Sequence, residues 1–296
     1  MGKIHRQKSR KDNRMTKERD IVITEKVSPM HPDKVADRIA GALVDYCYAM
    51  DIHHAPKCAF EVLIGHGRCT ITGETSVHIP TWFVKDTVRR ISKERIRTKY
   101  IEVPQDKHLA ANQEKEFRCG DNGVFAGYPM PKVHAIATDI CQELYEKAPY
   151  DGKIVLELKK GGDKLTICWS NVRNADLKAE YPNAKVNPIG EWTGGTSVDT
   201  GITGRKLASD FYGIMKPLGG GTMHGKDLSK ADCSVNIYCF LEAQKTGKEI
   251  KAICSIGDAD VNINGQMIPF ATIVQIAKEY IQKLGGFEKL AEWGLQ

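Results

Sequence analysis

Four segments of the 296-residue chain gather charged side chains among glycines and prolines, the setting in which binding and catalytic residues are commonly found. They are residues 25–34 (EKVSPMHPDK), 120–123 (GDNG), 194–206 (GGTSVDTGITGRK) and 219–232 (GGGTMHGKDLSKAD). In the first, His31, Asp33 and Lys34 stand where Pro32 would open a helix, and such a corner suits a phosphate group and a divalent metal. The alternative is that Pro32 and Asp33 only start the helix.

The second and third segments differ in how strongly they indicate a ligand. Residues 120–123 carry one carboxylate on a turn, and Asp-Asn-Gly is also ordinary turn chemistry. The glycines of residues 194–206 let the backbone approach a ligand closely, and Arg205 and Lys206 supply positive charge for phosphate oxygens.

The fourth segment, residues 219–232, nearly matches the phosphate-binding P-loop. Asp227 stands where the magnesium-binding Ser or Thr of that motif is required, and no apolar strand leads into it. What remains is a glycine-rich anion cradle with two lysines, Lys226 and Lys230, and with Asp232 as a candidate magnesium ligand. Together the four segments supply the cations and carboxylates that a triphosphate and its metal need. The residues alone therefore predict a magnesium-dependent enzyme that acts on a nucleotide.

The elements that must position these segments alternate between strands and helices. In the first half of the chain we predict a strand at 21–24, a helix from 32, a hairpin of 59–64 and 68–77 turned at 65–67, a helix at 81–95 and a loop or linker at 99–120. In the second half we predict a helix near 132–147, a hairpin of 153–160 and 164–170, helices near 203–213 and 227–245, strands near 249–256 and 259–264, and a helix at 270–284. The recurring pattern predicts an α+β fold of three related α/β units, with helices packed on antiparallel-rich sheets. The predicted divisions are a basic, disordered tail at 1–20, an N-terminal domain at 21–107, a central domain at 108–190 and a C-terminal domain at 191–296.

Composition excludes several classes of protein. Hydrophobic residues make up 41% of the chain and charged residues 27%, and no apolar run reaches the ~20 residues that a membrane span needs. The nine cysteines are scattered without a CxxC pair, which favours reduced thiols in a cytoplasmic protein and argues against structural zinc. Of the net charge of +6, residues 1–20 carry five. A solvated leader or a contact with nucleic acid would explain this tail, but the near-neutral remainder makes a nucleic-acid-binding body a poor interpretation.

Taken in order, the four segments resemble the signatures of the S-adenosylmethionine synthetase family. Residues 31–37 are similar to its GHPDK-x-AD signature, and residues 120–128 to its GDQG-x-x-x-GY segment. Residues 194–206 are similar to GG-x-x-x-D-x-GLTGRK, and residues 219–232 to GGG-x-x-x-GKD-x-x-K-x-D. The resemblance extends from about residue 21 to residue 285 and indicates a shortened, divergent member.

The resemblance implies ligand contacts position by position. The implied ATP contacts are His31, Asp151, Lys153, Trp192, Asp199, Arg205, Lys206, Thr222 and Lys226. The implied methionine contacts are Glu74, Gln105, Asp121, Asp199 and Lys230. Asp33 and Asp232 would hold Mg²⁺, two ions per site, and Glu61 would bind K⁺. Among these, the implied catalytic residues are His31, Lys153, Arg205, Lys226 and Lys230.

The resemblance also implies a reaction and an assembly. Methionine sulfur would attack C5′ of ATP, and the triphosphate would leave before its hydrolysis to pyrophosphate and phosphate. Two subunits would share each active site, in a homodimer or a dimer of dimers. Some positions depart from the family pattern, among them Met223 and His224, which replace a Phe-Ser pair. The alternative is a catalytically silent, nucleotide-binding relative with a regulatory or partner-binding role; nothing in the chain matches a kinase signature.

Overall fold

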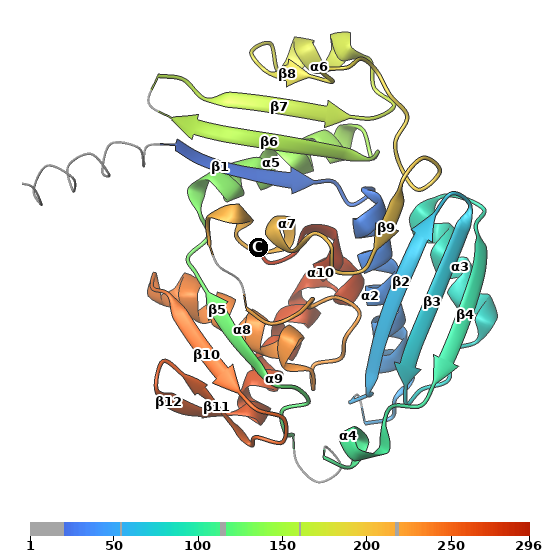
Figure 1. Ribbon diagram of the computed structural model, residues 1–296, viewed down its shortest axis with the longest axis vertical. Coiled ribbons are helices and arrows are strands. Elements are labelled where there is room, and N and C mark those ends of the chain that lie inside the picture. Colours follow the sequence, from blue (N-terminus) through green and yellow to red (C-terminus); the bar gives the residue numbers. More distant parts are fainter. Residues whose placement is uncertain (1–20, 54, 113–116, 160, 217–218) are drawn as a thin grey trace, which may run out of the picture.

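Three four-stranded sheets surround a group of central helices (Figure 1). The structure is a computed structural model that describes residues 21–296 except 54, 113–116, 160, 217 and 218. The predicted tail at 1–20 therefore lies outside the described residues. The arrangement of helices on largely antiparallel sheets confirms the predicted α+β class.

The first sheet joins the start of the chain to its middle. Its strands, in spatial order, are β1 (Ile21–Val27), β6 (Gly152–Lys159), β7 (Lys164–Trp169) and β8 (Lys185–Val186). Only the β7–β8 pair is parallel. Helix α5 (Lys132–Lys147) packs against it, and Ile154, Ile167 and Trp169 are fully buried in the small core between them. The short α6 (Asn174–Glu180) follows β7.

The second sheet presents one face to helices and leaves the other exposed. Its strands, in spatial order, are β4 (Arg97–Val103), β3 (Arg68–Thr75), β2 (Cys58–Gly65) and β9 (Thr200–Ile202). Residues alternate between buried and exposed along β2 and β3, as expected for a sheet with one covered face. Helices α2 (Pro32–Met50) and α3 (Thr81–Ser92) lie on its covered side (Figure 1).

The third sheet is built around the C-terminal half of the chain. Its strands, in spatial order, are β12 (Gln266–Pro269), β11 (Asp260–Ile263), β10 (Ile250–Cys254) and β5 (Gly123–Gly127). Helices α8 (Ala231–Thr246) and α9 (Phe270–Leu284) pack together, and α8 packs on β5 and β10. Helix α10 (Phe287–Trp293) packs along α2 and so joins the second and third sheets into one core.

Every sheet takes strands from two of the predicted units. β1 pairs with β6, β9 pairs with β2, and β5 pairs with β10, and each pair crosses a boundary that we placed near 107 or 190. The division into 21–107, 108–190 and 191–296 stays a prediction about the chain. In the structure, each of the three sheets contains strands from two of these predicted domains.

Several predicted elements need correction. The predicted loop at 99–120 contains most of β4 and the short α4 (Lys107–Ala111). β4 was missed because it is an edge strand in which no residue is fully buried, so its sequence shows no clear apolar alternation. The helix predicted near 203–213 is only the four-residue α7 (Leu207–Asp210), followed by a 3₁₀ turn at Gly213–Met215. Helix α8 begins at Ala231, four residues later than the predicted start at 227.

A buried histidine ties the first sheet to α7 and gives a pH-dependent prediction. His134 makes hydrogen bonds with Thr24 Oγ1 (2.8 Å) and with the Ser209 carbonyl oxygen (3.2 Å). Burial, with help from the Lys26 ammonium, lowers the pKa of His134 to about 4. A histidine in the unfolded chain titrates near ~6.5, so the unfolded state binds the extra proton first and stability falls as the pH drops from ~6.5 towards ~4.

We expect His134 to remove about 3 kcal/mol of unfolding free energy across that pH interval. Urea unfolding of the wild type and of His134→Gln at pH 7, 6, 5 and 4 measures this contribution. The stability advantage of the wild type over the variant should shrink as the pH falls. An advantage that stays constant across the series would contradict the assignment.

Candidate functional site

The start of helix α2 holds the glycine-rich segment 200–206 in place. His31 precedes the helix, and its Nδ1 accepts a hydrogen bond from the Asp33 backbone N–H (3.2 Å). The buried Asp33 carboxylate accepts hydrogen bonds from the Ile202 backbone N–H (2.9 Å) and from Lys206 Nζ (2.5 Å). Gly201 permits this approach, because a Cβ there would lie 2.0 Å from the Pro32 carbonyl oxygen. The helix start and the segment are therefore fixed to one another.

Further charged groups lie around Asp33. Arg205 approaches Asp33 Oδ1 to 3.6 Å, and its side chain remains more than half exposed. Burial raises the pKa of Asp151 to about 6, and the carboxylates of Asp199 and Asp33 add to this, while the Gly195 N–H and the Lys206 ammonium oppose it. These groups form the helix-start cluster, which consists of His31, Asp33, Asp151, Lys153, Asp199, Arg205 and Lys206.

His31 is neutral in this cluster and can act as a hydrogen-bond donor. Burial and the Lys206 ammonium lower the pKa of His31 to about 4, against the opposing effect of Asp33. Because Nδ1 accepts from the Asp33 N–H, the proton of the neutral ring lies on Nε2. Lys153 Nζ, within electrostatic range of His31, is paired with Glu25 Oε2 at 2.6 Å. The cluster thus offers one neutral and several cationic donors.

A second cluster forms where the 219–232 segment meets the edge of β2. Lys226 pairs as an isolated bridge with Ala59, and Lys226 Nζ lies 2.5 Å from Asp232 Oδ2. The Gly221 backbone N–H donates to Asp232 Oδ1 at 2.6 Å. Glu61 lies on the exposed face of β2, but partial burial still raises its pKa, and the nearby Lys226 ammonium opposes that effect. We call Glu61, Lys226 and Asp232 the strand-edge cluster.

Thr222 lies between the two clusters. A Cβ added at Gly204, whose φ is +82°, would meet Thr222 Cβ at 2.7 Å, so the Gly204 backbone lies directly against the Thr222 side chain. Gly204 directly precedes Arg205, and Thr222 lies four residues before Lys226. The segments 200–206 and 219–232 are therefore adjacent, which is compatible with the prediction from the sequence that both serve one site.

Lys230 is the most unusual of the predicted methionine contacts. Its side chain is about nine-tenths buried, and its ammonium has no hydrogen-bond partner within the part of the chain that the structure describes. The carboxylate of Asp227 lies 3.8 Å from it. A buried ammonium without a hydrogen-bonded partner is costly, so Lys230 is suited to receive an anionic group from a ligand.

The remaining predicted site residues do not belong to either cluster. Asp121 Oδ1 accepts from the Asn122 backbone N–H (2.7 Å), and its turn is tied to the segment of Lys230. Glu74 is exposed on β3 opposite Ala59. No described interaction joins Gln105 or Trp192 to either cluster; Trp192 Nε1 donates to Asn187 Oδ1 at 3.1 Å.

Four residues that our sequence analysis did not assign to the site support both clusters. They are Glu25, Asp37, Asp210 and His224. Asp37 lies within the first signature, and His224 is a departure from the family pattern in the fourth segment, but neither position indicated a contact. Such contacts depend on which distant segments the fold brings together.

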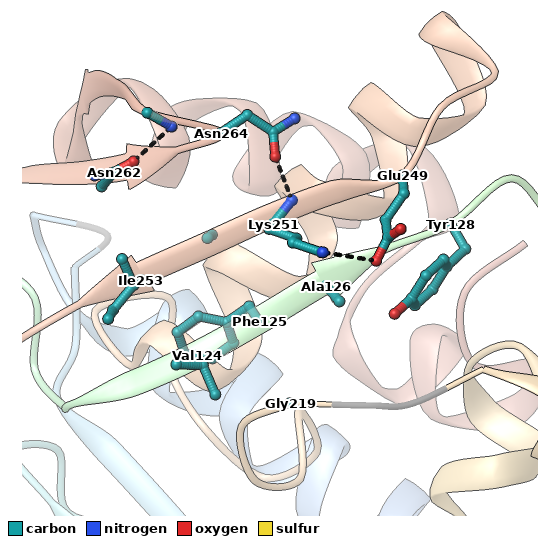
Figure 2. Close-up of a pocket in the computed structure, with 12 residues that line it drawn as sticks. Val124, Phe125, Ala126, Tyr128, Gly219, Glu249, Lys251, Ile253, Asn262 and Asn264 are labelled. Atoms are coloured by element: carbon teal, nitrogen blue, oxygen red, sulfur yellow. Dashed lines mark hydrogen bonds and ion pairs between the residues drawn. The ribbon is translucent and has the colours of Figure 1, made fainter. Parts of the chain in front are cut away.

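An apolar cavity lies on the outer face of the third sheet, next to the strand-edge cluster. It has a volume of about 490 Å³ and reaches Gly219 (Figure 2). Val124 and Ile253 line it, and its charged lining residues, Glu249 and Lys251, pair with each other at 3.7 Å. This cavity offers no concentration of cations, so it does not compete with the two clusters as a polyphosphate site.

The carboxylates of the two clusters suit a magnesium ion that also binds substrate phosphates, rather than a metal held entirely by protein ligands. Asp33 and Asp232 each present a single carboxylate beside lysines, and Mg²⁺ commonly binds through one or two carboxylates together with substrate phosphates. Glu61 offers one carboxylate for K⁺ on the exposed face of β2. The residues therefore fit metal that arrives with a polyphosphate.

Comparison with solved structures identifies the fold. A solved structure described as an unusual S-adenosylmethionine synthetase from Campylobacter jejuni superimposes with a TM-score of 0.75, at 18% identity, over 93% of this chain and 94% of that one. The chain thus has the S-adenosylmethionine synthetase fold. None of the helices among the described residues is long and apolar enough to span a bilayer.

Sequence comparison then identifies the family. Residues 19–109 match "S-adenosylmethionine synthetase, N-terminal domain", and residues 193–250 match "S-adenosylmethionine synthetase, C-terminal domain". The S-adenosylmethionine synthase of Sulfurimonas denitrificans is 28% identical over 74% of this chain and 70% of its own length. That of Helicobacter pylori strain J99 is 29% identical over 72% of this chain and 70% of its own length. The chain belongs to the S-adenosylmethionine synthetase family.

Proposed function

We propose that this protein forms S-adenosylmethionine from ATP and L-methionine. The observation that carries the proposal is the adjacency of the helix-start and strand-edge clusters at the Gly204–Thr222 contact. Several cations and two carboxylates suited to Mg²⁺ are thereby held at one place, which matches the charge of a triphosphate. Family membership supplies the choice of methionine as the second substrate.

In the proposed reaction, the methionine sulfur attacks C5′ of ATP and the whole triphosphate leaves, to be hydrolysed to pyrophosphate and phosphate. A thioether sulfur carries no proton, so no general base is needed. The chain would act by positioning the reactants and by stabilising the charge that grows on the leaving oxygen. His31 Nε2–H, Lys153, Arg205, Lys206 and Lys226 are the groups we assign to the phosphates.

The metals and the methionine side of the site follow from the same assignment. Asp33 and Asp232 would hold Mg²⁺, which would neutralise phosphate charge, and Glu61 would hold K⁺. We assign the methionine carboxylate to the buried ammonium of Lys230, which has no hydrogen-bond partner among the described residues, with Asp121, Asp199, Glu74 and Gln105 as further contacts. Asp151, Trp192 and Thr222 complete the nucleotide side.

The direct test incubates the purified protein with ATP, methionine, Mg²⁺ and K⁺ and measures S-adenosylmethionine and phosphate by chromatography. We expect methionine-dependent product, which Lys226→Ala should abolish and Lys245→Ala, an exposed lysine at the end of α8, should leave unchanged. A folded protein that binds ATP but forms no product would support the silent-relative alternative.

We also propose a homodimer that uses the exposed face of the second sheet. That face carries Leu63, Ile101 and Val103 at 51%, 38% and 39% exposure. The register places Arg68 beside Arg97 at one end and Glu61 and Glu74 towards the other. A two-fold axis through this face would set the basic end of one copy against the acidic end of its partner.

Light scattering after size exclusion is expected to give twice the 32.9 kDa of the chain. Leu63→Lys should shift the protein towards monomer, because it places a charge within the apolar centre of the face. Thr166→Lys, on a strand of the first sheet, serves as the control. A fully active monomer at assay concentrations would exclude a shared active site.

A further inference from the structure

A buried network of four ionisable side chains lies behind both clusters. Lys34 Nζ contacts the Asp210 carboxylate and lies 3.1 Å from Asp37 Oδ2 and 3.3 Å from His224 Nε2. His224 Nε2 in turn lies 2.9 Å from Asp210 Oδ2. None of the four residues is more than 3% exposed. Such a network is maintained only where each charge has a partner.

The network resembles a metal site but already contains its cation. Ligand atoms of Asp37, Asp210 and His224 lie within 4.8 Å of one another. The Lys34 ammonium contacts all three groups. Burial alone would lower the pKa of Lys34, but the carboxylates of Asp210 and Asp37 outweigh it and raise that pKa. The chain itself therefore supplies the positive charge.

The network reaches the backbone of both glycine-rich segments. Asp37 Oδ1 accepts a hydrogen bond from the Gly204 N–H at 2.8 Å, directly before Arg205. His224 stands two residues before Lys226, and its own backbone N–H donates to Thr222 Oγ1 at 3.1 Å. The imidazole of His224 is therefore held in the buried network, while its backbone is part of segment 219–232, which carries Lys226 and Asp232 of the strand-edge cluster. Asp37 likewise links the network to the helix-start cluster, because its carboxylate binds the backbone just before Arg205.

We propose that His224 and Asp37 are positioning residues that set the two glycine-rich segments in register with each other through the buried Lys34–Asp210 pair. Neither side chain is exposed enough to contact a ligand directly. Each acts through the backbone that carries Arg205 or Lys226. The consequence for polyphosphate binding rests on the proposed function; the consequence for the backbone does not.

Two measurements test the proposal. Hydrogen exchange monitors the Gly204 amide, and calorimetry monitors binding of inorganic tripolyphosphate with Mg²⁺. The variants are His224→Leu, which removes the ring nitrogens, and His224→Gln, whose amide can restore a donor towards Asp210. Ile273→Ala, in the buried face of α9, is the control for general destabilisation.

We expect His224→Leu to speed exchange at Gly204 at least tenfold and to weaken tripolyphosphate binding at least tenfold, with His224→Gln within threefold of the wild type. Ile273→Ala should change neither quantity more than its lowered stability requires. A folded His224→Leu protein with both quantities within twofold of the wild type would overturn the proposal.

Two further outcomes remain decisive. If His224→Leu does not fold, Asp37→Asn and Asp37→Ala replace it, because asparagine keeps an acceptor for the Gly204 N–H and alanine does not. Faster Gly204 exchange in the alanine variant alone would support the proposal, and equal exchange in both would overturn it. If the wild type binds no tripolyphosphate, the proposed function fails, and exchange at Gly204 still decides the role of the network.

Discussion

Replacing Asp33 with asparagine is expected to lower S-adenosylmethionine formation by about 10²–10³-fold. The carboxylate binds the Ile202 N–H and Lys206 Nζ and lies 3.6 Å from Arg205. Asparagine keeps an acceptor for the backbone but loses the charge that holds the two cations and, in our proposal, Mg²⁺. A loss of several kcal/mol of transition-state stabilisation corresponds to about this factor, at ~1.4 kcal/mol for each tenfold change.

The measurement is kcat and kcat/KM for ATP at saturating methionine, over a series of Mg²⁺ concentrations. Asp176→Asn is the matched control, because Asp176 is an exposed aspartate that pairs with Arg173 at 2.8 Å within one helical turn. We expect the control to retain wild-type kinetics. Activity of Asp33→Asn within fivefold of the wild type at all Mg²⁺ concentrations would remove Asp33 from the metal site.

The sequence predicted which residues form the candidate site better than it predicted the ion pairs that those residues make. Asp33 and Lys206 both stood in recognisable segments, but the Lys206–Asp33 ion pair joins positions 173 residues apart. Lys153 was predicted as a phosphate contact, and its pairing with Glu25 follows from the antiparallel register of β1 and β6. Local sequence carries residue type and spacing, whereas such pairs depend on which strands meet.

The same limit explains the elements that were missed. β9 has three residues, too few for a periodic pattern, and it exists because β2 offers it a partner and Gly201 lets it approach α2. The long helices α2 and α9 were predicted because their apolar faces repeat over several turns. His224 was visible only as a departure from the family pattern, and its burial against Lys34 required the fold.

The largest expected effect on stability comes from Lys34→Met. Methionine has nearly the length of lysine but no charge, so the change would leave the buried carboxylates of Asp210 and Asp37 without their ammonium. Removing one partner of a buried ion pair costs about 3–5 kcal/mol. Burial alone would raise the pKa of Asp210, but Lys34 and His224 now hold it below its usual range, and much of that effect would disappear.

Urea unfolding at pH 7 should show this loss as a lower midpoint with an unchanged slope. Lys251→Met, an exposed lysine that lies 3.7 Å from Glu249, should shift the free energy of unfolding by less than about 0.5 kcal/mol. The double variant Lys34→Met/Asp210→Leu separates two causes. If the loss comes from stranded charge, the second substitution should recover part of the stability, because an apolar replacement of a buried ion pair is often neutral. If the double variant is less stable than Lys34→Met, stranded charge is not the main cause of the loss, and the Asp210 carboxylate stabilises the fold through its remaining contact with His224 even without Lys34.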